Sequence, residues 1–137
     1  MKLTVHTDGG SLNNPGQAGI GFLIHEGTTL FHTHSEAIGI ASNNVAEYTA
    51  LIRALTYIKE QISSGKWTVE SILVKADSEL MIKQVTGLYK VKNADLRALH
   101  SQVKILEMEL GIPITYQHVL RHLNAEADAL VKKAVGR

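Results

Sequence analysis

The 137-residue sequence contains no cysteine. Disulfide bonds, cysteine nucleophiles and thiolate sites for zinc or iron–sulfur clusters are therefore excluded. The sequence also lacks an apolar run long enough to cross a bilayer and an N-terminal apolar segment of the secretory kind. We therefore expect no membrane association and a cytoplasmic location. Carboxylates, imidazoles, hydroxyls and amines remain as catalytic groups.

Excess charge of either sign is missing as well. Fourteen Lys and Arg residues stand against thirteen Asp and Glu residues, which gives a formal net charge of +1. A chain with this balance is not a strongly basic nucleic-acid clamp, so any contact with nucleic acid has to be local. The length fits one domain over residues 1–137, because a chain of this size can bury one core. No repeat or low-complexity tract marks a boundary.

Alternating apolar residues, β-branched runs and turn residues predict five strands and four helices. The strands are expected at 2–8, 18–26, 29–38, 69–76 and 113–119, and the helices at 43–63, 78–85, 93–110 and 124–134. Short connections make the first three strands antiparallel. The run Ser71-Ile72-Leu73-Val74 is typical of a buried parallel strand, which we expect at the centre of the sheet. The expected caps are Asn43 or Asn44, Ser78, Asn93 and Asn124. The order indicates an α/β fold with a mixed sheet.

Four acidic residues stand where strands end or helices begin. They are Asp8, Glu47, Asp77 and Asp128. In an α/β sheet such positions converge on one crevice, and carboxylates brought together need a compensating cation. Two divalent metals held by oxygen ligands would suit phosphoryl chemistry. Taken alone, each of these residues is more often a turn, cap or helix-dipole residue, so the spacing by itself leaves the choice open.

A family resemblance resolves this choice. The motifs that carry it are Thr7-Asp8-Gly9-Gly10-Ser11 with Asn14-Pro15-Gly16, Asn43-Asn44-Val45-Ala46-Glu47-Tyr48, Ala76-Asp77-Ser78 and Asn124-Ala125-Glu126-Ala127-Asp128. They resemble, in order and spacing, the successive motifs of type 1 ribonuclease H. One Thr-Asp-Gly would be weak evidence, but the ordered set spans residues 4–134 and is specific.

The resemblance implies a ribonuclease H-like fold, with three antiparallel and then two parallel strands in a five-stranded mixed sheet. It also implies two Mg²⁺ ions, replaceable by Mn²⁺, and hydrolysis of the RNA strand of RNA/DNA hybrids to leave 5′-phosphate ends. By position, Asp8 would bridge both metals and Asp128 would complete the site of the attacking water. Glu47 and Asp77 would hold the second metal.

The resemblance also implies a set of substrate contacts. They would come from Gly9, Asn14, Ser42, Asn43, Asn44 and Ser78. Asparagine amides can donate to 2′-hydroxyls and accept from guanine edges, which is the type of contact that distinguishes RNA from DNA. Turn and cap chemistry is the alternative reading for these residues. Val45 departs from the pattern, because many bacterial members carry a basic residue there.

The sequence departs from the family pattern in two further places, which concern catalysis and the binding of nucleic acid. Many members have a catalytic histidine in a loop before the last helix; the corresponding segment is short here, and His122 is the candidate, whereas His118 belongs to the preceding strand. Some members insert a basic handle between the middle helices. This chain has only residues 87–93 there, in which Lys90 and Lys92 either touch phosphate or are simply solvated.

These observations favour a monomeric ribonuclease acting on RNA/DNA hybrids. A nuclease of the same chemistry acting on double-stranded RNA stays open, as does a catalytically weak nucleic-acid-binding module. Intact carboxylates argue against the module, because they would repel phosphate unless metals were bound. Kinases and ATPases of related fold need duplicated domains and glycine-rich phosphate loops, which the sequence lacks.

Overall fold

A five-stranded mixed sheet forms the centre of the molecule. The computed structural model describes residues 1–136. The strands are β1 (Lys2–Ser11), β2 (Gly16–Glu26), β3 (Thr29–Ala41), β4 (Ser71–Ala76) and β5 (Ile114–His118). Their order across the sheet is β3-β2-β1-β4-β5, with β1 to β3 antiparallel and β4 and β5 parallel to β1. The expected ribonuclease H-like arrangement of strands is confirmed.

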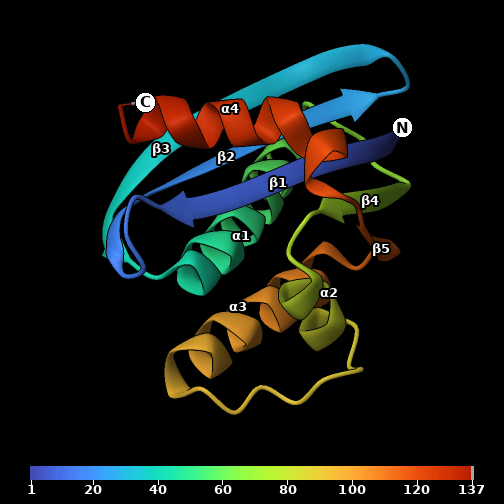
Figure 1. Cartoon of the computed structure of the whole chain (residues 1–137). Helices are drawn as coiled ribbons and strands as arrows, with labels where there is room; N and C mark the ends of the chain where they lie inside the picture. Colours follow the sequence, from blue (N-terminus) through green and yellow to red (C-terminus); the bar gives the residue numbers. More distant parts are fainter. Residues whose placement is uncertain (137) are drawn as a thin grey trace.

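Helices cover both faces of this sheet. They are α1 (Asn43–Ser63), α2 (Glu79–Val85), α3 (Ala94–Leu110), a 3₁₀ turn η1 (Arg121–Asn124) and α4 (Ala125–Ala134). Helix α4 crosses β1 to β3 on one face, α1 lies against the other, and α3 packs on α1 (Figure 1). Tyr48 and Phe22 are the largest fully buried side chains of the core. Within residues 1–136, no helix combines the length and apolarity that a membrane span requires.

The first strand is longer than predicted. It continues through Gly9 and Gly10 to Ser11, where the sequence suggested a turn. Pairing with β2 overrides the local turn preference, since Gly10 lies opposite Gly19 in an unbroken antiparallel ladder. Asp8 therefore lies within β1, and the prediction that it closes the strand is wrong.

The prediction that the fourth strand is central is also wrong. Strand β4 begins at Ser71 rather than residue 69 and has β5 on its outer side, so β1 is the middle strand. The β-branched run reports burial, and an interior strand next to the centre is buried equally well. The composition of a strand therefore does not specify its order in the sheet.

The helix caps are partly as expected. Ser78 and Asn93 cap α2 and α3 with their side chains, as predicted. Helix α1, however, is capped by the hydroxyl of Ser42, which accepts from the backbone N–H of Val45, and not by Asn43 or Asn44. Asn124 precedes α4 but makes no side-chain cap bond; its Nδ2 donates instead to the carbonyl of Thr7 on β1.

Candidate active site

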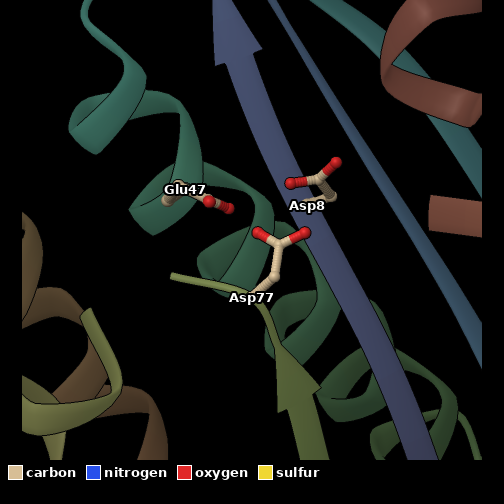
Figure 2. Close-up of side chains that lie close together, drawn as sticks. All are labelled: Asp8, Glu47 and Asp77. Atoms are coloured by element: carbon tan, nitrogen blue, oxygen red, sulfur yellow. The ribbon is translucent and has the colours of Figure 1, made fainter. Parts of the chain in front are cut away.

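Three of the four predicted carboxylates form one cluster. Asp8 comes from the middle strand, Glu47 from the second turn of α1, and Asp77 from the residue after β4. Each offers an oxygen atom, and these atoms all lie within 4.8 Å of one another. Their side chains point toward a common centre from three different elements (Figure 2). The parallel pairing of β1 with β4 brings the first and third residues together, as expected for adjacent strand ends.

Glycine at position 9 sets the distance between β1 and α1. A Cβ atom there would lie 2.3 Å from the backbone carbon and oxygen of Ala46. Without it the two backbones come close enough for the Gly9 N–H to donate to Oε1 of Glu47 over 2.9 Å. The bond fixes the Glu47 carboxylate, which is only 8% exposed, against the strand that carries Asp8.

Two carboxyl groups of the cluster have raised pKa values. Burial, together with the charges of Asp77 and Asp128, raises the pKa of Asp8 to about 7. Burial and the charges of Asp8 and Asp77 raise the pKa of Glu47 well above its usual range. The ionised forms are costly because the carboxylates are desolvated and repel one another.

Such a donor set fits a divalent cation. Hard cations such as Mg²⁺ take carboxylate oxygens, and their charge offsets the repulsion that raises the pKa values. The three clustered carboxylates therefore form a site that could hold a metal.

Metal binding to this cluster should release protons at mildly acidic pH. Because the pKa of Asp8 is raised to about 7, its carboxyl is mostly protonated at pH 6 and ionised at pH 9. We expect Mg²⁺ affinity to rise by up to about tenfold per pH unit between 5.5 and 7, and to level off above 8. Calorimetric titration in two buffers of different ionisation enthalpy should detect proton release at pH 6 and less release at pH 9. A constant affinity over this range would contradict the raised pKa.

Asp128 lies beside the cluster rather than in it. It stands in the first turn of α4 and lines a pocket of about 310 Å³ together with Asp8 and Glu47. Its Oδ2 is 2.9 Å from Nζ of Lys132, one helical turn further on. The fold thus brings the fourth carboxylate to the same pocket, where it is paired with an ammonium group.

Helix α4 reaches this position because β2 carries glycine at the crossing. A Cβ atom at Gly21 would lie 2.5 Å from Cβ of Leu130 and 2.8 Å from the carbonyl oxygen of Ala127. Gly21 pairs directly with Asp8 in the β1–β2 ladder. The same close crossing therefore places Asp128 near Asp8.

Three polar residues of the site were not among the candidate site residues predicted from the sequence. Asn124, expected only as a cap, is 1% exposed, and its Nδ2 donates to the carbonyl of Thr7 and to Oδ2 of Asp77 (2.9 and 3.4 Å). Arg121 lines the carboxylate pocket, and its charge lowers the pKa of Asp8. Lys132 was also missed, although its spacing of four residues from Asp128 on one helix favours an ion pair between them.

The predicted substrate-contact asparagines meet at the start of α1. Oδ1 of Asn43 accepts from the N–H and hydroxyl of Ser11, and Oδ1 of Asn14 accepts from the N–H of Asn43. Both residues are exposed, and both Oδ1 atoms are engaged within the protein, so in this arrangement they are less available to accept from a guanine edge, which is the contact that the sequence suggested. Asn44 is exposed beside them, and Ser42 is the helix cap.

The remaining candidates lie at different distances from the cluster. Gly9 lines the carboxylate pocket, whereas Ser78 caps α2 directly after Asp77. His122 is exposed in η1 and lines a separate hollow with His6 and Glu126. The structure therefore does not bring His122 to the carboxylates, and its catalytic role stays a prediction.

Comparison with known proteins places this architecture in a family. The family model described as Reverse transcriptase-like matches residues 6–134. LC11-RNase H1, solved in complex with an RNA/DNA hybrid, superposes with a TM-score of 0.91 at 38% identity, covering 98% of this chain and 96% of that one. The chain belongs to the ribonuclease H family. The family match confirms the resemblance drawn from the four motifs.

Relatives within the ribonuclease H family differ in length. The bifunctional protein Rv2228c of Mycobacterium tuberculosis is 36% identical over 98% of this chain, which spans 36% of that protein. Ribonuclease HI of Halobacterium salinarum is 33% identical over 98% of this chain, which spans 64% of that protein. The chain thus corresponds to about one third of the mycobacterial relative and to less than two thirds of the halobacterial one.

Proposed function

We propose that this chain is an endoribonuclease that hydrolyses the RNA strand of RNA/DNA hybrids with the help of two divalent ions, Mg²⁺ or Mn²⁺. The main support for this proposal is the cluster of Asp8, Glu47 and Asp77, whose carboxylate oxygens lie within 4.8 Å of one another. The cluster lies in a fold similar to that of a ribonuclease H1 solved with such a hybrid. We further propose that the chain acts as a monomer in the cytoplasm.

Each carboxylate would have its own part. Asp8 would contribute to holding both ions, Glu47 and Asp77 would hold one of them, and Asp128 would complete the other site. When bound, two such ions supply Lewis acidity that activates water and stabilises the leaving oxygen. The water oxygen would form a bond to phosphorus as the bond to the ribose 3′-oxygen breaks. One proton of the water would pass through solvent to the leaving oxygen, which leaves a 5′-phosphate and a 3′-hydroxyl.

The rest of the chain would orient the substrate and the carboxylates. The Gly9 N–H and the Asn124 amide hold Glu47 and Asp77 in place, so the ligands need little reorganisation. The NH₂ groups of the exposed residues Asn14 and Asn43 would donate to 2′-hydroxyls in the minor groove. Only an RNA strand presents the 2′-hydroxyl, which supports specificity for that strand.

A substrate panel tests this proposal. End-labelled RNA/DNA, RNA/RNA, DNA/DNA and single-stranded RNA are incubated with Mg²⁺, Mn²⁺ or EDTA. We expect metal-dependent cutting of the RNA in the hybrid alone, with 5′-phosphate ends. Comparable cutting of RNA/RNA would identify a nuclease with double-stranded RNA as substrate. Binding of the hybrid without cutting under any metal would identify a nucleic-acid-binding module.

Replacing His122 by Ala should have a modest effect. If the imidazole assists the leaving group or product release, turnover should fall by about tenfold or less, at the weak end of general-acid contributions. Its exposed position outside the carboxylate pocket supports this upper limit. His118→Ala, at the exposed end of β5, is the matched control. A thousandfold loss in steady-state kcat would show that His122 is essential, and no change would leave it without a role.

The affinity of the protein for nucleic acid should be low and should depend on the salt concentration. Lys90 lines an open groove with Arg97, His100 and Lys104, and Lys92 is exposed beside it. With about three or four phosphate contacts, affinity should fall about 10¹–10²-fold between 50 and 200 mM salt. Changing Lys90 and Lys92 to Glu should raise KM and flatten the salt slope, with single-turnover chemistry nearly unchanged.

The matched control changes the same amount of charge elsewhere. Lys2→Glu with Lys66→Glu alters two exposed lysines, at the start of β1 and in the turn after α1. If both double variants bind hybrid as tightly as the wild type at every salt concentration, Lys90 and Lys92 are only solvated. The grip would then come from the asparagines at the start of α1 and from Arg121.

A further inference from the structure

Helix α4 carries an ion pair at the wall of the carboxylate pocket. Nζ of Lys132 lies 2.9 Å from Oδ2 of Asp128, and the two residues are four apart on one helix. Both line the pocket that also contains Asp8 and Glu47. Their side chains are 53% and 30% exposed, so water reaches the pair. Lys132 is therefore a cation placed directly beside the proposed metal ligands.

Three of the four carboxylates are held in different ways. Glu47 is buried and fixed by a backbone N–H, and Asp77 accepts from the buried Asn124 amide. Among the described residues, Asp128 is paired with the ammonium group of Lys132, which lies at the end of a long flexible side chain. Neutral, rigid donors can stay in place when a cation binds the same carboxylate. An ammonium group bears like charge and is repelled by that cation.

The pair is also easy to break. Exposed ion pairs spaced four apart on a helix change an equilibrium by only about twofold. A divalent cation with carboxylate ligands on several sides exerts a stronger pull on the same oxygen. The greater charge of a divalent ion therefore favours its replacement of Lys132 on Asp128. Loss of the ion pair should change the stability of the protein only slightly.

We propose that Lys132 is a positioning residue that competes with a divalent cation for the carboxylate of Asp128. Before metal binds, it keeps Asp128 at the pocket and neutralises its charge. Once the cation takes Asp128, the Lys132 ammonium is released within the same pocket, where it can pair with the phosphodiester. The inference rests on the proposed function, because it presumes metal and phosphate in this pocket.

Metal titration of the protein without nucleic acid tests the competition. In Lys132→Gln we expect the Mg²⁺ dissociation constant, measured by calorimetry and by the Mg²⁺-dependent rise in Tm, to fall by about two- to fivefold. Lys133→Gln is the matched control, since it removes the same charge from the next, exposed residue of α4. Its dissociation constant should stay within about 1.5-fold of wild type. In an Asp128→Asn background, Lys132→Gln should no longer tighten Mg²⁺ binding.

Turnover tests the second part. At saturating Mg²⁺, Lys132→Gln should lower kcat on the hybrid by about tenfold, and Lys132→Arg should keep most of it. Unchanged or weaker Mg²⁺ binding in Lys132→Gln would overturn the competition, and an unchanged kcat would overturn the phosphate contact. Failure of the proposed function looks different: wild type would then bind no Mg²⁺, or would bind it without cutting the hybrid.

Discussion

Asp8→Asn should abolish cleavage and at the same time stabilise the protein at neutral pH. The side chain belongs to the cluster and lies on the middle strand, and an amide of the same shape cannot supply its charge to a metal. We expect less than a thousandth of wild-type kcat. Residual activity above one tenth in the purified variant would contradict the assignment.

The gain in stability follows from the raised pKa of Asp8, about 7 in the folded protein. Folding favours the protonated carboxyl, so its stabilising effect is complete below pH 4 and is lost as pH rises through 7. Without metal, Asp8→Asn should therefore match wild type near pH 4 and exceed it by on the order of 2–4 kcal/mol at pH 8.

Thermal melts at pH 4, 6 and 8, with and without Mg²⁺, check this prediction. Excess Mg²⁺ should raise the Tm of wild type at pH 8 and have much less effect on Asp8→Asn. Asp95→Asn, which changes an exposed aspartate in the first turn of α3, is the control and should alter stability by less than about 1 kcal/mol at all three pH values. Destabilisation of Asp8→Asn at pH 8 would show that the cluster is not under electrostatic stress.

Gly9→Ala should damage both the fold and the site. The added Cβ would meet the backbone of Ala46 at 2.3 Å and the backbone nitrogen of Glu47 at 2.6 Å, so α1 itself has to move. We expect a loss of about 3 kcal/mol in the free energy of unfolding, the upper part of the range for overpacking, and a fall in Tm of about 10 °C. Because α1 carries Glu47, a shift of about 1 Å should also lower kcat by about 100-fold.

Gly10→Ala is the matched control on the neighbouring residue of the same strand. A Cβ atom there would have its nearest contacts at 3.8 Å, with Oδ1 of Asn43 and Cγ1 of Val131, which is ordinary packing distance. Its Tm should lie within about 2 °C of wild type. If chemical denaturation shows the two variants equally stable, the close approach of β1 and α1 does not constrain position 9.

Local sequence patterns predicted much of the architecture. Alternating and β-branched residues predicted five strands, and recurring apolar positions predicted the helices, because these periods reflect which faces are buried. Ser78 and Asn93 were recognised as caps because a polar side chain before an apolar period has one obvious use. The four acidic residues could be singled out by spacing, but only the ordered motifs favoured a site over separate turn and cap roles.

Other features depended on contacts between distant segments. The extension of β1 through Gly9 and Gly10 needs β2 as a partner, and the position of β4 beside the centre needs β5 on its outer side. The choice of Ser42 over Asn43 as the α1 cap has the same origin. The Asn43 oxygen is already used by Ser11, 32 residues away.

The sequence by itself determined which elements form, which faces are buried and which residue types are available for chemistry, because these properties follow from local periodicity and side-chain identity. The tertiary structure alone decided that three of the four carboxylates, Asp8, Glu47 and Asp77, form the cluster, that Asp128 lies beside it, and that Asn124 supports Asp77. Those outcomes depend on the close crossing of helices over glycines of the sheet. Such crossings arise between residues far apart in the chain, where no local pattern records the distance.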